Sequence, residues 1–404
     1  MARRFNLKPL CANICAALVI AGMPLAAQAQ QFSPESFVDA EFKASHALEL
    51  IRAQYAYSWG YTGKGITVAI VDSGLDINHP EFSGRVSPFM ANYEPGHSAT
   101  DVYSGLDVGG NSHGTHVAGL AAAGRNGFGM HGVAYNATVL PLRTSFDDEE
   151  LDQAFAQAIK AGAKVLNGSY GPDAFAPSYI PDSNNPGQYM KNEGHRQLNF
   201  QAVLPNIESN YEQMKAAAAA DIVMVFSAGN ERQFQPGEYT AIPSGNGMLP
   251  LITPANTSLA GGSNPLYRFL NPGEDFDSND AETFVYVDEA DASDSDRQET
   301  ESWDFSDLKG TLIASVATDP QGKIAAYSNW CGAAAAWCIA APGGGGSDDN
   351  SMYSAVPYGS YGDKSGTSMS APVVAGAAAV LREAFPYMTA RQIIEVLLTT
   401  ADST

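Results

Sequence analysis

The sequence predicts an α/β fold built on a mostly parallel central sheet with helices on both faces. From residue 63 onward, short runs of β-branched and apolar residues alternate with longer stretches of helical periodicity. Strands that are apolar on both faces are typical of a parallel sheet buried between two helical layers. Polar residues directly follow several of these runs, and such residues gather at the carboxyl ends of parallel strands. A functional site is therefore expected at that edge of the sheet.

The run from Ile66 to Val71 is the clearest strand because it is continuously β-branched or apolar and carries no charge. The stretch that begins at His113 is rich in Ala, Val and Gly, as a packed helix would be. By the same patterns we predict strands at 66–71, 138–142, 164–167, 222–226, 312–316 and 338–340, and helices at 113–123, 149–161, 207–219, 368–384 and 390–400.

Three stretches interrupt this alternation. Residues 30–62 are a short polar and amphipathic lead-in segment, in which apolar residues recur at helical spacing. Residues 172–206 contain five prolines and are expected to form a long surface loop. Residues 258–309 are acidic and are expected to be an insertion on the scaffold, with a brief strand at 283–287. Loops of this length in a compact domain are usually functional or disordered.

The N-terminus has the features of an export signal. A basic start is followed by a mostly apolar stretch at 10–22 and by the small-residue cleavage pattern Ala27-Gln28-Ala29. We predict a signal peptide at residues 1–29, since the apolar stretch is too short for a transmembrane helix. The α/β region is then 63–404. Because the chain stops abruptly after Asp402, we expect that it is truncated at its C-terminus.

The charge of the chain excludes some partners. Removal of residues 1–29 takes away three of the 22 basic residues and none of the 44 acidic residues, so the mature chain has 19 basic residues and a formal charge of −25. Nucleic acid is not expected as a partner, because its phosphates would be repelled. Membrane tethering is expected only through a missing C-terminal region.

Two of the four cysteines remain after the predicted signal peptide is removed. Cys331 and Cys338 have six residues between them, which is not the CxxC spacing of a redox or zinc site. An even pair in an exported chain predicts a disulfide. Two buried thiols are the alternative.

Three segments each offer one member of a serine nucleophile system. Asp72 ends the first strand, whereas His113 and Ser368 each open a predicted helix. A serine hydroxyl needs an imidazole to take its proton, and the imidazole needs an orienting carboxylate. Asn230 follows the predicted strand 222–226 and offers an amide donor to an oxyanion. Taken singly, each residue is equally compatible with a helix or turn cap. Their joint occurrence in this order favours catalysis.

These segments closely resemble the subtilisin-like (S8) serine peptidases, through 71–74, 113–116, 227–230 and 366–372. The resemblance implies a subtilisin-like three-layer sandwich and a serine endopeptidase that acts through an acyl-enzyme. It assigns Asp72, His113 and Ser368 to the catalytic triad and Asn230 to the oxyanion hole. Residues 44–51 look like the lead-in of Gram-negative autotransporter subtilases, which implies secretion or an outer cell-surface location. The alternative is an inactive subtilase-fold module that binds a surface partner through its acidic insertion.

The resemblance also implies a cleft for an extended protein or peptide substrate. The segments that match cleft positions in subtilases are Ser169, Tyr170 and Gly171 on one side, and Gly132, Val133 and Ala134 on the other. By the same reasoning, Ala228 and Gly229 are expected to line the primary pocket, where small residues suggest an open apolar space.

No cofactor is required by this chemistry. A structural calcium ion is compatible with the acidic surplus, although no EF-hand spacing is present. No metal-binding site is predicted from the side chains. His116 lies three residues after His113, but the pair lacks the HExxH glutamate and the third ligand that a zinc site needs.

Overall fold

The computed structural model describes residues 3–4, 32–102, 112–171, 175–181, 189–198, 207–232, 242–253, 266–269, 284–287, 304–347 and 350–403. Each predicted strand and helix of the alternating region is present, with ends shifted by at most two residues. The strands are β2 (Thr67–Asp72), β4 (Thr138–Arg143), β5 (Val165–Gly168), β8 (Val223–Ser227), β11 (Leu312–Thr318) and β12 (Cys338–Pro342). The helices are α5 (His113–Ala122), α6 (Asp148–Lys160), α7 (Ile207–Ala219), α9 (Thr367–Ala384) and α10 (Ala390–Thr400).

These strands form a mostly parallel sheet. Its order is β15-β1-β12-β11-β8-β5-β2-β4-β3, and every pair is parallel except β1 with β15. The edge strands β3 (Ala91–Asn92) and β15 (Asp402–Ser403) are short, and so is β1 (Arg3–Arg4) next to β15. From β2 the chain passes to β4 on one side and then to β5, β8, β11 and β12 on the other. The carboxyl end of β2 is therefore the switch point at which open α/β sheets bind their ligands.

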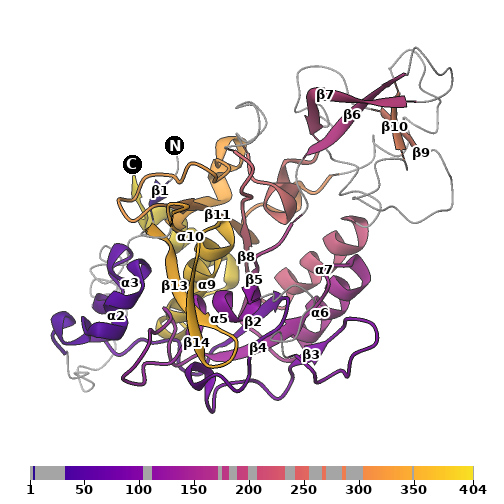
Figure 1. Cartoon of the computed structure of the whole chain (residues 1–404). Coiled ribbons are helices and arrows are strands. Elements are labelled where there is room, and N and C mark those ends of the chain that lie inside the picture. The colour runs from indigo at the N-terminus through magenta and orange to yellow at the C-terminus, as the bar shows by residue number, and fades with distance from the viewer. Residues whose placement is uncertain are drawn as a thin grey trace.

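The sheet is buried on both faces, as the apolar strands predict (Figure 1). Alternate residues of β2 point to opposite sides, so that Val68 and Ile70 join one buried cluster while Ala69 and Val71 join the other. Helices α5, α9 and α10 cover the first face, and α6 and α7 cover the second. This arrangement confirms the expected subtilisin-like three-layer α/β sandwich.

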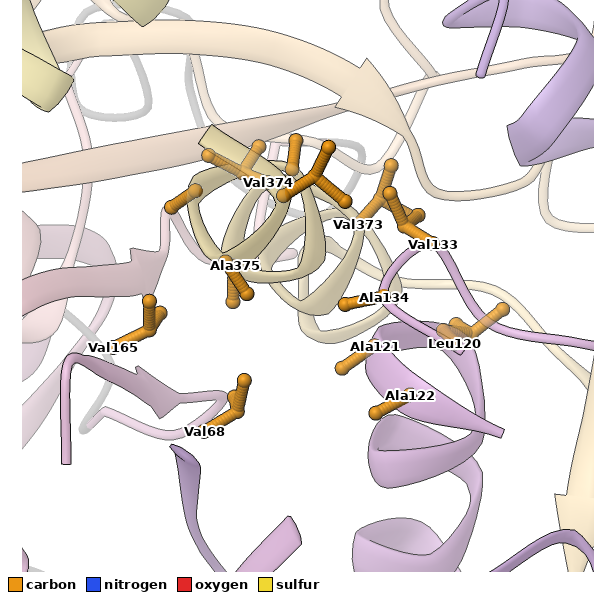
Figure 2. Packing of buried hydrophobic residues seen from close by; sticks show 14 of the residues in the cluster. Val68, Leu120, Ala121, Ala122, Val133, Ala134, Val165, Val373, Val374 and Ala375 are labelled. Atoms are coloured by element: carbon orange, nitrogen blue, oxygen red, sulfur yellow. The ribbon is translucent and has the colours of Figure 1, made fainter. Parts of the chain in front are cut away.

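Helix α9 lies at the centre of the first face. Figure 2 shows Ala375 of α9 on the side of the strand residues Val165 and Val68, and Val373 beside Val133. Gly376 permits this close packing, because an added Cβ would lie 2.7 Å from the Val133 Cβ and 2.8 Å from the Ala121 carbonyl oxygen. Helix α9, which bears Ser368, is thus held tightly against the rest of the core.

The lead-in segment shares this core. Its short helices α2 (Ala40–Ala44), α3 (His46–Leu50) and α4 (Gln54–Ser58) bury Phe42, Leu48 and Tyr57 in the same cluster as α5 and α9. The Tyr57 hydroxyl donates a hydrogen bond of 2.7 Å to the Val133 carbonyl. The predicted signal peptide lies outside the described residues except for Arg3 and Arg4. None of the helices in the described parts of the chain is long and apolar enough to cross a membrane.

Both predicted insertions contain strands. The 172–206 stretch was expected to be a loop, but β6 (Phe175–Pro181) and β7 (Tyr189–Leu198) pair within it as an antiparallel hairpin. Prolines do not prevent this pairing, because the register shifts between Pro177 and Tyr179. In the second insertion, the expected strand is present as β10 (Phe284–Val287), paired with β9 (Leu266–Phe269). Figure 1 shows the two pairs away from the central sheet.

Two further features lie between β11 and α9. Cys331 and Cys338 form the expected disulfide, with their Cα atoms 5.5 Å apart. The hairpin of β13 (Met352–Val356) and β14 (Ser360–Lys364) was not predicted, and β13 packs against α5.

We expect the substitution Gly376→Ala to destabilise the protein. Higher helix propensity alone would add about 1 kcal/mol to the free energy of unfolding. The two contacts below 3 Å make the added methyl group overpacked, which costs about 1–3 kcal/mol. Thermal denaturation should therefore show a lower Tm, and a raised Tm would contradict this description of the α5–α9 contact.

Candidate active site

The candidate site begins at the switch point of the sheet. Asp72 is the last residue of β2 and is fully buried, and His113 is the first residue of α5. Gly114 allows α5 to begin this close to β2, because an added Cβ would lie 2.1 Å from the Gly74 carbonyl oxygen and 3.1 Å from Asp72 Oδ1. The glycine after His113 is thus required by packing rather than by backbone conformation.

Asp72 and His113 are joined by a hydrogen bond. The imidazole Nδ1 lies 2.8 Å from Asp72 Oδ1 and 3.0 Å from Oδ2. Burial of the imidazole would lower the pKa of His113, but the charge of Asp72 and this hydrogen bond outweigh it and raise the pKa above its usual value. With Nδ1–H donated to the carboxylate, Nε2 is the ring nitrogen that can accept a proton.

Ser368 is held in the first turn of α9 by the neighbouring strand. It is the second residue of that helix, and its Oγ donates to the Ser169 carbonyl at 3.2 Å. In return, the Ser169 hydroxyl donates to the Ser368 carbonyl at 2.9 Å. Ser169 directly follows β5, which pairs with β2. The serine and the Asp72–His113 pair are therefore brought to one edge by adjacent strands.

Asn230 and the Ser368 amide border the same small space. A Cβ added to Gly366 would lie 3.6 Å from the Ser368 nitrogen and 3.7 Å from Asn230 Nδ2. Asn230 Oδ1 accepts hydrogen bonds from the Thr367 amide at 2.8 Å and the Thr367 hydroxyl at 3.0 Å, which leaves its amide group as the donor. As one of the first four amides of a helix, the Ser368 N–H has no intrahelical acceptor. Two donors suited to an oxyanion thus converge beside Gly366.

Thr367 was not singled out from the sequence, although it lies within the motif at 366–372. Its hydroxyl accepts a hydrogen bond from the Gly229 amide at 3.0 Å while donating to Asn230. Thr367 therefore joins the start of α9 to the segment that follows β8.

The expected substrate residues fall into three groups. Ser169 lies beside Ser368, and the ring of the next residue, Tyr170, packs against Phe146, with 5.3 Å between the ring centroids. Phe146, which is partly exposed, was not identified from the sequence. Gly171 contacts Gly245, since a Cβ on either residue would lie about 3 Å from the Cα of the other.

Gly132, Val133 and Ala134 do not form an exposed edge, contrary to expectation. Val133 and Ala134 are fully buried, and Figure 2 shows them between α9 and α5. The three backbone amides donate to carbonyl oxygens at the end of α5, at 2.8 to 3.1 Å. The amides satisfy the final turn of that helix, so a substrate strand cannot use them.

Ala228 and Gly229 support Asn230 instead of both facing a pocket. Ala228 is fully buried, so the expectation of an exposed pocket wall is wrong for this residue. Its backbone amide donates to Ser315 and its carbonyl accepts from Ser244. Gly229 is half-buried and adopts a left-handed conformation, with φ 97°.

The other two histidines near this region are buried and serve the core. His116 Nε2 lies 2.9 Å from the Met352 carbonyl oxygen, and burial lowers the pKa of this histidine to about 3. His131 packs among Phe42, Tyr57 and Tyr135. Within the described ranges, no group of three or more His, Cys, Asp or Glu side chains is arranged to hold a metal ion.

The pKa of His113 tests the electrostatics of this pair. In an Asp72→Asn variant the carboxylate charge is lost while the burial of the imidazole remains, so the His113 pKa should fall below its ordinary value of about 6.5. An NMR titration of the His113 imidazole in both proteins measures this. Equal pKa values would show that Asp72 does not control the protonation of His113.

Comparisons with known proteins agree with this arrangement. The model of the subtilase family (peptidase S8) matches residues 63–404. An extracellular serine protease of Serratia marcescens is 30% identical over 386 residues, covering 91% of this chain and 32% of that protein. Serotype-specific antigen 1 of Mannheimia haemolytica is 25% identical over 415 residues, covering 87% of this chain and 37% of that protein. The chain therefore spans about a third of the length of these relatives.

Solved structures share the fold. The nisin leader peptidase NisP of Lactococcus lactis superposes with a TM-score of 0.53 at 20% identity, covering 91% of each chain. A protease of Pseudoalteromonas arctica gives a TM-score of 0.53 at 22% identity, covering 85% of this chain and 86% of that one. With its motifs, its sheet order and the family match over residues 63–404, the chain belongs to the subtilase family.

Proposed function

We propose that this protein is a secreted or cell-surface serine endopeptidase that uses Asp72, His113 and Ser368. The observation that carries the proposal is the hydrogen-bonded Asp72–His113 pair at the switch point, beside the helix start that bears Ser368. The Asp72 carboxylate makes His113 a stronger base, which is what activation of a serine requires. Membership of the subtilase family and the similarity to an extracellular serine protease support the same activity and location.

In the proposed reaction, the Ser368 side chain turns from the Ser169 carbonyl toward the imidazole. Oγ attacks the substrate carbonyl carbon while its proton passes to His113 Nε2. Asp72 stabilises the resulting imidazolium, and Asn230 Nδ2 with the Ser368 N–H stabilises the oxyanion. His113 then gives the proton to the leaving amine, so that the peptide C–N bond breaks and an acyl-enzyme remains. A water molecule, activated by His113, releases the acyl group and restores Ser368.

Extended protein or peptide segments are the proposed substrates. The segment 169–171 follows a strand end, its residue Ser169 bonds to Ser368, and a peptide can add to the backbone at the exposed residue Gly171. The Phe146 and Tyr170 rings next to it offer an apolar contact for a substrate side chain. The strongly negative charge of the chain argues against nucleic acid as a partner.

A structural calcium ion is a further proposal. It rests on the acidic surplus of the chain, because a hard cation with oxygen ligands would offset part of this negative charge.

Removal of Asn230 tests the proposed activity. An Asn230→Ala variant should lose about 10²- to 10³-fold in kcat, a magnitude that comes from subtilisin, another subtilase. Steady-state hydrolysis of an unstructured protein substrate measures it, with Ser368→Ala as the inactive reference. Asn136→Ala is a matched control that should retain full activity, because the Asn136 side chain bonds to Thr62 at the end of the lead-in. Unchanged kcat in Asn230→Ala would remove Asn230 from the oxyanion hole, and an inactive, folded wild type would favour the binding-module alternative.

Chelation tests the calcium proposal. EDTA should lower the Tm of the wild-type protein and added Ca²⁺ should restore it, because binding to the folded state alone stabilises that state. A Tm that is the same with EDTA and with Ca²⁺ in the wild type would mean that no calcium ion supports this fold.

A further inference from the structure

Glu231 directly follows the proposed oxyanion donor and accepts two hydrogen bonds with its carboxylate. Oε1 lies 2.9 Å from the backbone nitrogen of Asn230, and Oε2 lies 2.6 Å from Nδ2 of Asn329. Both donors are N–H groups, so the carboxylate oxygens are used as acceptors of charge-assisted hydrogen bonds. The Glu231 side chain thus joins the Asn230 backbone to Asn329, which is 98 positions from Glu231 in the sequence.

Asn329 completes a reciprocal set of bonds. Its side chain is fully buried, and its Oδ1 accepts a hydrogen bond of 3.3 Å from the Glu231 amide. The backbone N–H of Asn329 donates to the Gly229 carbonyl at 3.0 Å. Three hydrogen bonds therefore connect residues 229–231 with Asn329, and a fourth joins the Glu231 carboxylate to the Asn230 amide. We call Glu231 and Asn329 together the clamp pair.

The clamp pair lies directly over the left-handed residue that precedes Asn230. A Cβ on Gly229 would lie 2.4 Å from Glu231 Oε2 and 2.6 Å from Asn329 Nδ2. The Asn230 side chain is exposed, and its Oδ1 is held by Thr367. The clamp pair holds the backbone of Asn230, so the two sets of bonds control its orientation from different sides.

Asn329 is itself tied to the sheet. Cys331, two residues further on, forms a disulfide with Cys338, the first residue of β12. Strand β12 pairs with β11, and Ser315 of β11 accepts a hydrogen bond from the Ala228 amide. The segment that carries Asn329 and the segment that carries Asn230 are therefore both attached to β11.

We propose that Glu231 and Asn329 are positioning residues, which hold the Asn230 amide where the oxyanion forms. The consequence for catalysis rests on the proposed function, whereas the mechanical role of the clamp pair does not. The contribution of an oxyanion donor depends on its being aimed in advance at the developing charge. A loosened clamp pair should therefore lower kcat and leave KM nearly unchanged.

An exchange of donor and acceptor isolates this role. Glu231→Gln replaces Oε2, which accepts a hydrogen bond from Asn329 Nδ2, by an NH₂ group. Asn329→Asp replaces Nδ2, the donor of that hydrogen bond, by an oxygen. Each single variant loses one hydrogen bond. In the double variant, Glu231→Gln/Asn329→Asp, the new amide donates to the new carboxylate, and the remaining acceptors face the Asn230 and Glu231 amides as before. The double variant also keeps the net charge of the wild type.

Hydrogen–deuterium exchange tests the clamp pair without any need for activity. In each single variant, peptides that cover residues 228–232 should exchange faster than in the wild type, because the Asn230 segment opens more often. The double variant should return to the wild-type rate. Glu49→Gln is the control for the loss of one carboxylate, since Glu49 lies exposed on a lead-in helix. Exchange at 228–232 that is unchanged in both single variants would overturn the proposal.

Kinetics test the consequence for catalysis. We expect each single variant to lose on the order of tenfold in kcat, the equivalent of one hydrogen bond to a charged group, and the double variant to recover most of it. In an Asn230→Ala background the clamp substitutions should change kcat very little, because their effect acts through Asn230. Full additivity with Asn230→Ala, or no recovery in the double variant, would contradict the positioning role. An inactive wild type would refute the proposed function, and the exchange result would still decide the mechanical claim.

Discussion

The approach of α5 to the carboxyl end of β2 is the constraint on which the site depends. It requires Gly114, because any larger residue would place a Cβ 2.1 Å from the Gly74 carbonyl oxygen. It also requires a sheet that reverses its direction of growth at β2, so that no neighbouring connection covers the strand end. Once α5 begins there, His113 lies within 2.8 Å of a buried carboxylate, and the raised pKa of His113 follows from that distance.

The remaining groups reach the site through the other strands of the same sheet. Ser169 after β5 bonds to Ser368 in both directions, and Asn230 after β8 is bonded to Thr367 at the start of α9. Helix α9 therefore connects the strand ends on one side of the switch point. Because α9 is packed tightly against α5 through Gly376, the position of Ser368 also depends on the core far from it. The placement of α9 therefore determines both the packing of the core and the position of Ser368.

The sequence alone was sufficient for the strands and helices of the alternating region and for placing Asp72, His113 and Ser368 at element ends, because both depend on local pattern. Buried strands such as 66–71 are continuous apolar runs, and Asp72 and His113 lie at element ends that such patterns locate. The burial of a residue that packs against segments distant in the sequence was not predictable from local pattern. Val133 is a small apolar residue in a Gly-rich segment, and only the Tyr57 hydroxyl and α5 show that it belongs to the core. The bond between Glu231 and Asn329 joins residues 98 positions apart, and no local pattern marks it.

The central claim is that Asp72, His113 and Ser368 form one activated nucleophile. Labelling with a fluorophosphonate, followed by mass spectrometry of the modified peptide, tests it most directly. We expect a single adduct on Ser368 that is absent from Ser368→Ala and nearly absent from His113→Ala, with the wild type shown to be folded by circular dichroism. An adduct on another serine, or no adduct on the folded wild-type protein, would contradict the claim.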